Sequence, residues 1–340
     1  MAEMPNRSVR ARWALIAAVG ATAVTPAAAQ ASDEVVAELR VVGPNGPLEE
    51  GTSYVTNSER IRTDPQALCF FDGEGGSGDR VRLPGPTAMG LLETAGDATP
   101  AVNPLSVTDE YGFGLGLCGV GDVVAGANDF WNVKVNHQAL QVGGDQFALE
   151  VGDEVLWQLT GFPPDPELQL AAAPGTTPGT MSVSVVRWIC STDYPPPDPV
   201  CTSEPAGGVT VTGADADTTT DGTGSATVTL ATSKTYELRA ANEGDLDSNV
   251  AEVCVSAVAG ECPPEGTPRG RTIVGRQVAD DFSATDGWDD VKSKGGDDRI
   301  RLLSGTDRVS CGGGRDKVIV DLDGDDVIAT SCEWVKTLPG

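Results

Sequence analysis

Residues 296–318, GDDRIRLLSGTDRVSCGGGRDKV, contain three copies of a nine-residue unit in which an aspartate is followed, two positions later, by an apolar residue. The unit occurs six times in succession, as Asp280/Phe282, Asp289/Val291, Asp298/Ile300, Asp307/Val309, Asp316/Val318 and Asp325/Val327. A helix would repeat with a period of about 3.6 residues, so the observed period excludes a helical repeat. Short strands joined by tight turns fit it, and the sequence therefore predicts a C-terminal parallel β-roll.

Glycines mark the turns of this roll. Four units carry a glycine two residues before the aspartate, namely Gly287, Gly296, Gly305 and Gly314. Glycine adopts positive φ without steric cost, so we expect these residues in turn conformations. If two units complete one coil, apolar residues eighteen apart stack in the same sheet: Phe282, Ile300 and Val318 in one sheet, and Val291, Val309 and Val327 in the other.

The turn aspartates are candidate calcium ligands. They are expected to face one another between successive coils, and Ca²⁺ prefers six to eight hard oxygen ligands. The predicted metal ligands are Asp289, Asp298, Asp307, Asp316 and Asp325, with calcium as a weakly bound cofactor. An alternative stays open, because Arg299, Arg308 and Lys317 also recur beside the aspartates and could neutralise them in a purely structural roll.

The repeat resembles the haemolysin-type (RTX) calcium-binding repeats, G-G-x-G-x-D-x-apolar-x, over about residues 275–328. The aspartate is kept in all six units and the glycine before it in four. The leading glycine pair is mostly lost, since only the unit Cys311-Gly312-Gly313-Gly314-Arg315-Asp316 keeps its second glycine. The resemblance implies a calcium-stabilised roll with degenerate repeats.

The first residues have the pattern of a secretory signal peptide, predicted over residues 1–31. Three arginines, at positions 7, 10 and 12, precede the apolar run Trp13–Val24, which is too short to span a bilayer. Ala29-Gln30-Ala31 fits a small-x-small cleavage pattern, with an uncleaved anchor as the alternative. No later stretch has the apolar length of a membrane helix. We therefore expect a secreted, extracellular protein, with cell-surface association as a variant of that expectation.

All eight cysteines follow the signal peptide. In an exported chain an even number of cysteines favours disulfides over metal ligands. The connectivity stays open from sequence alone, but locality suggests the pairs Cys69–Cys118, Cys190–Cys201, Cys254–Cys262 and Cys311–Cys332.

The net charge restricts the partners. It is −27 for the whole chain, and about −29 without the charged residues of the signal peptide. So much negative charge argues against nucleic acid and anionic lipid as partners. It suits cation binding and the solubility of an exported protein equally well.

Residues 32–161 are expected to form a β-rich domain with one helix. Asn45-Gly46 and Asn136-His137 are hairpin-turn signals. A helix is predicted from Ala88, capped by Thr87 and ended by Gly96.

The runs Phe130–Asn136 and Leu149–Trp157 resemble the C-terminal domain of transcobalamin-type proteins, which bacteria carry in a largely uncharacterised secreted family. In transcobalamins this domain closes over a corrinoid. The all-helical partner domain is not found in this sequence, so we do not expect that ligand. Trp131 and Trp157 are candidates for a ligand cleft, with core packing as the other interpretation.

Residues 162–262 alternate like strands, and the stretches Gly208–Val211, Thr219–Val228 and Tyr236–Ala240 resemble bacterial immunoglobulin-like or carboxypeptidase-regulatory-like sandwich modules. Residues 263–270 are a proline-containing linker before the roll, residues 271–340. The predicted fold class is mainly β and multidomain: a β-rich domain with one helix, a β-sandwich and a C-terminal parallel β-roll.

The sequence favours a binding protein over an enzyme. His137 is the one histidine of the chain and falls at a predicted turn, and no nucleophile motif accompanies it. The favoured function is a secreted or surface-associated modular binding or adhesion protein whose ligand is an unknown extracellular molecule or surface. A small-molecule-binding protein that uses the transcobalamin-like domain is the first alternative, and an unrecognised carboxylate-dependent hydrolase is the second.

Overall fold

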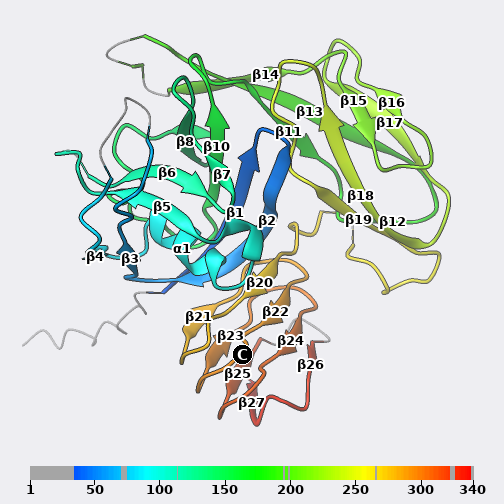
Figure 1. The fold of residues 1–340 in the computed structure, drawn as a ribbon. Coiled ribbons are helices and arrows are strands. Elements are labelled where there is room, and N and C mark those ends of the chain that lie inside the picture. The colour runs from blue at the N-terminus through cyan, green and yellow to red at the C-terminus, as the bar shows by residue number, and fades with distance from the viewer. Residues whose placement is uncertain are drawn as a thin grey trace, which may run out of the picture. The chain divides into compact units, whose positions relative to one another are not determined.

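The computed structural model describes residues 34–69, 75–112, 114–193, 196–197, 200–264, 266–321 and 326–337. The predicted signal peptide and Asp325 lie outside these residues. The described part contains many strands, one α-helix and one short 3-10 helix, η1 (Pro100–Val102), so the mainly β prediction is confirmed (Figure 1). No helix within it is long and apolar enough to cross a membrane.

The first module is built on a sheet whose strands run in the order β2 (Gly46–Thr56), β1 (Val35–Gly43), β10 (Glu154–Thr160), β8 (Phe130–Val135) and β9 (Gln138–Ala139). The helix α1 (Ala88–Gly96) packs against β1 and β2. Its cap is the predicted one, because the Thr87 hydroxyl accepts a hydrogen bond from the Gly90 N–H at 3.1 Å. Both predicted turns are also found, with positive φ at Gly46, Asn136 and His137.

The two faces of β1 and β2 belong to different cores. Leu39, Val41 and Tyr54 face the helix and form the first core with it. Val36 and Val55, on alternate positions, pack instead with the apolar residues of the roll. This sheet is therefore buried on both faces at its β1–β2 end.

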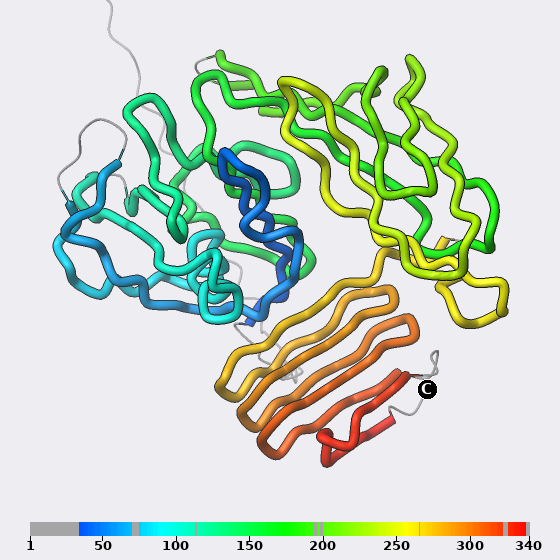
Figure 2. Tube along the Cα trace, turned by 45° about the vertical axis from the view of Figure 1, so that its right-hand side comes forward, coloured from blue at the N-terminus to red at the C-terminus, as the bar shows by residue number. Residues whose placement is uncertain are grey.

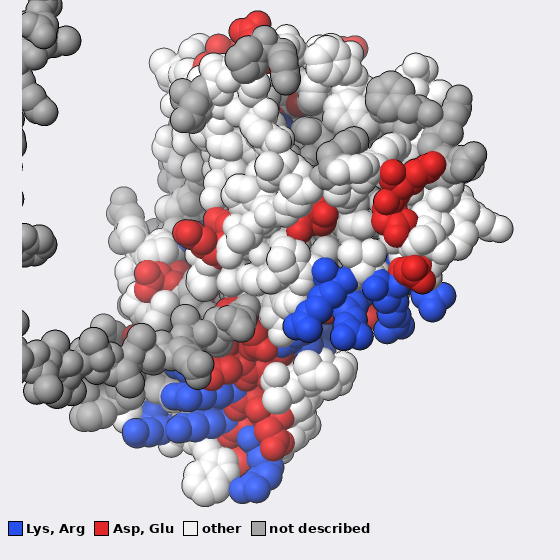
Figure 3. All heavy atoms as spheres, turned by 90° about the vertical axis from the view of Figure 1, so that its left-hand side faces the viewer, with Lys and Arg blue, Asp and Glu red and all other residues white. Residues whose placement is uncertain are grey.

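Two smaller sheets complete the module. One has the strands β5 (Leu105–Thr108), β6 (Gly116–Val120) and β7 (Val123–Val124). The other is a ribbon of β3 (Arg60–Arg62) and β4 (Arg80–Arg82). Arginines occupy the outer positions of both ribbon strands, and Figure 3 shows basic side chains gathered on this face.

The second module is a sandwich of two sheets, as predicted. One contains β11 (Glu167–Ala171), β13 (Gly179–Cys190), β14 (Cys201–Pro205) and β17 (Ser225–Leu230). The other contains β12 (Gly175–Thr176), β19 (Ala251–Val255), β18 (Lys234–Ala241), β15 (Thr210–Thr212) and β16 (Thr218–Thr219). The two sheets share one core, which includes Val185, Val228, Leu238 and Val253.

The roll consists of two parallel sheets whose strands alternate along the chain, and its stacked coils are visible in Figure 2. One sheet contains β20 (Thr272–Val274), β22 (Asp290–Lys292), β24 (Arg308–Ser310) and β26 (Val327–Ile328). The other contains β21 (Asp281–Ser283), β23 (Arg299–Arg301), β25 (Lys317–Val320) and β27 (Trp334–Thr337). Phe282 pairs with Ile300 and Ile300 with Val318, which confirms the eighteen-residue coil.

The last coil departs from that period. Val309 pairs with Ile328, whereas Val327 pairs with Arg308. Val327 is 58% exposed, so its predicted place in the stack is wrong. The coil from Val309 to Ile328 is one residue longer than the earlier ones. A shift of one residue turns a strand's side chains to the opposite face, which takes Val327 out of the stack.

The roll and the first module share a sheet. Ser53 and Tyr54 of β2 pair in parallel with Ile273 and Val274 of β20, so one sheet of nine strands runs through both. The four disulfides join the pairs that locality suggested, and no cysteine of the described residues is free.

Candidate functional site

The aspartates of the roll form two hydrogen-bonded columns inside the turns. Apart from Asp280 and Asp289, which begin the columns, each carboxylate accepts a hydrogen bond from the backbone N–H of the aspartate one coil earlier. The distance is 2.9 Å for Asp280 N to Asp298 Oδ1, for Asp289 N to Asp307 Oδ1 and for Asp298 N to Asp316 Oδ1. All five side chains are buried.

The columns end on two carboxylates that were not predicted. Asp326 Oδ1 accepts from the Asp307 N–H at 2.9 Å, and Glu333 Oε2 accepts from the Asp316 N–H at 2.8 Å. Asp325 lies outside the described residues, and Asp326 holds the position expected for it because the last coil is longer. Glu333 stands two residues before Val335, which pairs with Val318, so a carboxylate-x-apolar pattern would have found it.

The second carboxylate oxygens divide the columns into two groups. In the first two units the chain satisfies them, because the N–H groups of Arg276 and Thr285 donate to Asp280 Oδ2 and Asp289 Oδ2, both at 2.7 Å. The remaining Oδ2 atoms are buried and have no hydrogen-bond partner among the described residues. They belong to Asp298, Asp307 and Asp316. The nearby Ser293 hydroxyl donates to the Cys311 carbonyl.

Negative charge is costly at these positions. Burial raises the pKa of Asp307 to about 7, and the charges of Asp289 and Asp326 add to this effect. Burial likewise raises the pKa of Asp298 to about 6, although the nearby Ser293 hydroxyl and the Asp280 backbone N–H both oppose that shift. A cation beside these oxygens would offset that cost.

The turn glycines behave as predicted. Gly287, Gly296, Gly305 and Gly314 have φ of +117°, +120°, +137° and +147°. Stacking adds a second constraint, because a Cβ at Gly305 would lie 1.7 Å from the Gly287 carbonyl oxygen. Only glycine allows the coils to approach so closely.

Arg276 pairs with the column residue Asp280 at 2.7 Å, but the three basic residues that recur beside the aspartates do not neutralise the columns. Arg299 pairs at 3.9 Å with Asp281, which is not a column residue, and Arg301 pairs with the same carboxylate at 2.8 Å. Within the described part of the chain, Arg308 and Lys317 form no ion pair with a column aspartate. The residue after each aspartate begins a strand and points to the opposite side of it, so Arg299, Arg308 and Lys317 are not placed to neutralise the columns.

The carboxylate oxygens of the columns are chemically suited to calcium, but they supply few of the six to eight ligands that the ion prefers. Buried carboxylate oxygens without partners are hard donors of the kind that Ca²⁺ prefers. No three acidic, histidine or cysteine side chains of the described residues converge closely enough to hold a metal. An ion would therefore take Asp298, Asp307 or Asp316 and complete its shell with backbone carbonyls and water. Both oxygens of Asp289 already accept hydrogen bonds from backbone N–H groups, so this predicted ligand has less free capacity for an ion than the other three.

The two candidate cleft tryptophans are core residues. Trp131 is 7% exposed and Trp157 is 2% exposed, and both belong to the first core. The Trp157 indole N–H donates to the Ala88 carbonyl at 3.2 Å, and a Cβ at Gly144 would lie 2.6 Å from the indole ring. The space around Trp157 is filled, so the interpretation of a ligand cleft is corrected to core packing.

A polar cleft of about 590 Å³ lies where the three modules meet. Charges of both signs line it, including Glu50, Glu237, Glu252, Arg269 and Arg308. Its lining differs from the mostly apolar walls of typical small-molecule sites.

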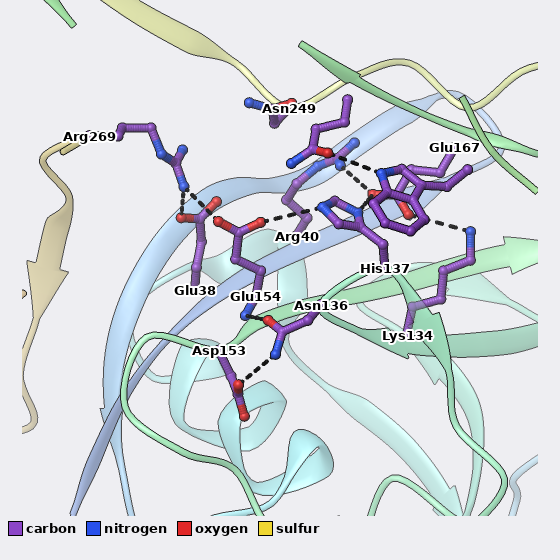
Figure 4. A network of polar contacts seen from close by, with 12 residues as sticks. Glu38, Arg40, Lys134, Asn136, His137, Asp153, Glu154, Glu167, Asn249 and Arg269 are labelled. Carbon is purple, nitrogen blue, oxygen red and sulfur yellow. Dashed lines mark hydrogen bonds and ion pairs between the residues drawn. The ribbon is translucent and has the colours of Figure 1, made fainter. Parts of the chain in front are cut away.

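A cluster of charged side chains joins the first module to the sandwich (Figure 4). Glu167, the first residue of β11, is 2% exposed. Its carboxylate lies 3.3 Å from Arg40, 3.4 Å from Lys134 Nζ and 3.1 Å from His137 Nδ1. The His137 ring also stacks on Trp188 at 4.7 Å between centroids. His137 is the predicted turn residue, but its role in this contact was not predicted.

The partners of Glu167 keep it ionised. Burial by itself would raise the pKa of Glu167, but the hydrogen bond with His137 and the charges of Lys134 and Arg40 outweigh this and hold the pKa at about 2. Burial lowers the pKa of Lys134, and the charge of Glu167 opposes that shift. Three basic groups thus surround one buried carboxylate.

Acid is expected to weaken this cluster. Because the pKa of Glu167 is lower in the folded protein than its ordinary value of 4.5, its stabilising contribution is complete above about pH 5 and disappears as the pH falls towards 2. We expect the difference in free energy of unfolding between the wild type and Glu167→Gln to shrink over that range, as measured by urea titrations from pH 6 to pH 2. A difference that stays constant with pH would contradict this assignment.

Comparisons with known proteins assign no family to this chain. No protein-family model matches the chain, and a search of curated proteins finds no similar sequence.

Proposed function

We propose that this chain is an exported, modular binding protein whose C-terminal roll is stabilised by calcium. The observation that carries the proposal is the set of buried Oδ2 atoms of Asp298, Asp307 and Asp316, which have no hydrogen-bond partner among the described residues. Export is supported by four disulfides, which form and persist in oxidising compartments.

The position of these carboxylates supports a structural role for calcium. They lie in a roll whose β20 pairs with β2, and whose core includes Val36 and Val55 of the first module. An ion that offsets the buried charge of the columns would therefore stabilise the nine-stranded sheet that both modules share. In this proposal the first module and the sandwich present binding surfaces, and the roll supports the first module.

Calcium is expected to raise the stability of the full-length chain. With a dissociation constant on the order of 10⁻⁴–10⁻³ M, typical of extracellular modules, a tenfold excess of Ca²⁺ over that constant adds about 1.4 kcal/mol per site. The measurement is the free energy of unfolding in EDTA and in increasing Ca²⁺ at pH 8, with Mg²⁺ as the control ion.

A pair of variants tests whether the columns bind the ion. Asp307→Asn keeps an oxygen for the Asp289 N–H and removes the charge, so it should lose the part of the calcium response that comes from its column. Asp281→Asn removes a half-exposed aspartate outside the columns and should keep the response. Equal stability of the wild type in EDTA and in millimolar Ca²⁺ would refute calcium stabilisation and leave a purely structural roll.

A further inference from the structure

Four arginines form a compact array on the ribbon of β3 and β4. In the antiparallel register Arg60 lies opposite Arg82, and Arg62 lies opposite Arg80. Opposite residues, and residues two apart on one strand, point to the same face. All four arginines are exposed, whereas Ile61 between the first two is buried. One face of a ribbon with three residues per strand therefore carries four guanidinium groups.

The four arginines form no ion pair with the described residues around them. Arg82 donates to the Ser58 hydroxyl at 3.2 Å, but none of the four arginines forms an ion pair with a described carboxylate. The neighbouring Glu59 is paired with Arg276 at 3.5 Å. Glu93 on α1 is close enough for the charge of Arg80 to act on it, but it too forms no ion pair there.

Such an arrangement costs stability unless a ligand uses it. Like charges directly opposite each other on two strands are destabilising, and this ribbon contains two such pairs. The cost is unusual in a chain with a net charge of −27, where acidic residues outnumber basic ones by 50 to 23. An anionic partner would remove the repulsion and form charge-assisted hydrogen bonds with planar guanidinium groups.

We propose that the arginine array of Arg60, Arg62, Arg80 and Arg82 binds an anionic polysaccharide that carries sulfate, phosphate or carboxylate groups. Its side chains start about 7 Å apart along each strand and about 5 Å apart across the ribbon, so it suits closely spaced anions along a chain of sugars. This inference names the ligand class of the proposed binding protein and rests on that proposal, but it does not depend on calcium in the roll.

Features of the ribbon favour a polysaccharide over other polyanions. Its apolar residues, Ile61 and Val81, point away from the arginine face, so the strands offer no anchor for a lipid bilayer. Neither strand carries an aromatic ring on which nucleic-acid bases could stack.

The test is binding of the full-length chain to immobilised dextran sulfate, with neutral dextran as the uncharged control, in EDTA so that calcium cannot bridge the two. The wild type should bind only the sulfated polymer. For about four released counterions its affinity should fall about 50- to 150-fold between 50 and 200 mM salt, by the slopes known for nucleic acids.

Two variants with the same net charge identify the site. Replacing Arg60, Arg62, Arg80 and Arg82 by serine should weaken binding at least about tenfold and should not lower the melting temperature, because the like-charge pairs are gone. The second variant replaces four exposed cations elsewhere by serine and should change binding less than about twofold relative to the wild type. These cations are Lys234, Lys292, Arg299 and Lys336. Replacing the four arginines by lysine should give an intermediate loss.

Three outcomes would overturn the inference. The first is an equal loss in both serine variants, which would indicate diffuse attraction without a site. The second is array-dependent binding that is tighter to phosphatidylglycerol vesicles or to single-stranded DNA than to dextran sulfate. The third is absence of binding by a wild type that melts cooperatively. Because all arms contain EDTA, a failure of calcium stabilisation would leave each of these results unaffected.

Discussion

Replacing Glu167 by glutamine is expected to lower the free energy of unfolding by about 3–5 kcal/mol. The carboxylate is 2% exposed and faces Arg40, Lys134 and His137. Glutamine keeps the size of the side chain but leaves two buried cations without their counter-charge. Breaking a buried ion pair leaves an uncompensated buried charge, which is among the most destabilising results of a single substitution. Urea unfolding followed by tryptophan fluorescence measures it, and Trp188 lies beside the cluster.

An exposed glutamate provides the matched control for this substitution. Glu204 is 56% exposed at its side chain and lies 3.9 Å from Arg187, so Glu204→Gln should change stability by less than about 1 kcal/mol. Adding Lys134→Met to Glu167→Gln removes one unpaired cation and should restore part of the loss. Equal effects of the two single glutamine variants would show that the Glu167 cluster contributes no more than a surface pair.

Gly305→Ala is expected to destabilise the roll by about 3 kcal/mol or more, since strain at positive φ and a backbone clash act together. Gly305 has φ of +137°, and an added Cβ would lie 1.7 Å from the Gly287 carbonyl oxygen. That oxygen is backbone and cannot rotate away, so the adjacent coils have to separate. Hydrogen exchange of the Arg308 and Val309 amides on β24 should become faster than in the wild type.

Gly313→Ala is the control for the turn substitution. An added Cβ at Gly313 meets no atom within 4 Å, and its φ is outside the left-handed region. We expect its effect on stability to stay within about 0.5 kcal/mol. If Gly305→Ala were tolerated equally well, close stacking would not be the reason for glycine in these turns.

Local patterns predicted the elements that depend on neighbouring residues. The nine-residue period predicted the coil that pairs Phe282 with Ile300, because a parallel roll repeats its backbone at a constant interval. The Thr87 cap and the Asn136-His137 turn follow from residue chemistry over two to four positions. Cysteine proximity suggested the four disulfides, since short loops are entropically the easiest to close.

The strand-rich class, the roll, the helix cap and the turns could thus be predicted from the amino-acid sequence, because all of them arise from short-range periodicity and backbone preference. Which carboxylates lack partners depends on the folded coils. At the same repeat position, Asp289 is hydrogen-bonded by the N–H of Thr285, whereas Asp307, preceded by Leu303, has an oxygen without a partner. Only the tertiary structure decided that Glu167 meets Arg40 across 127 residues and that the arginines of β3 face those of β4. Such contacts depend on which sheet edges and faces pack together, and no local pattern encodes that choice.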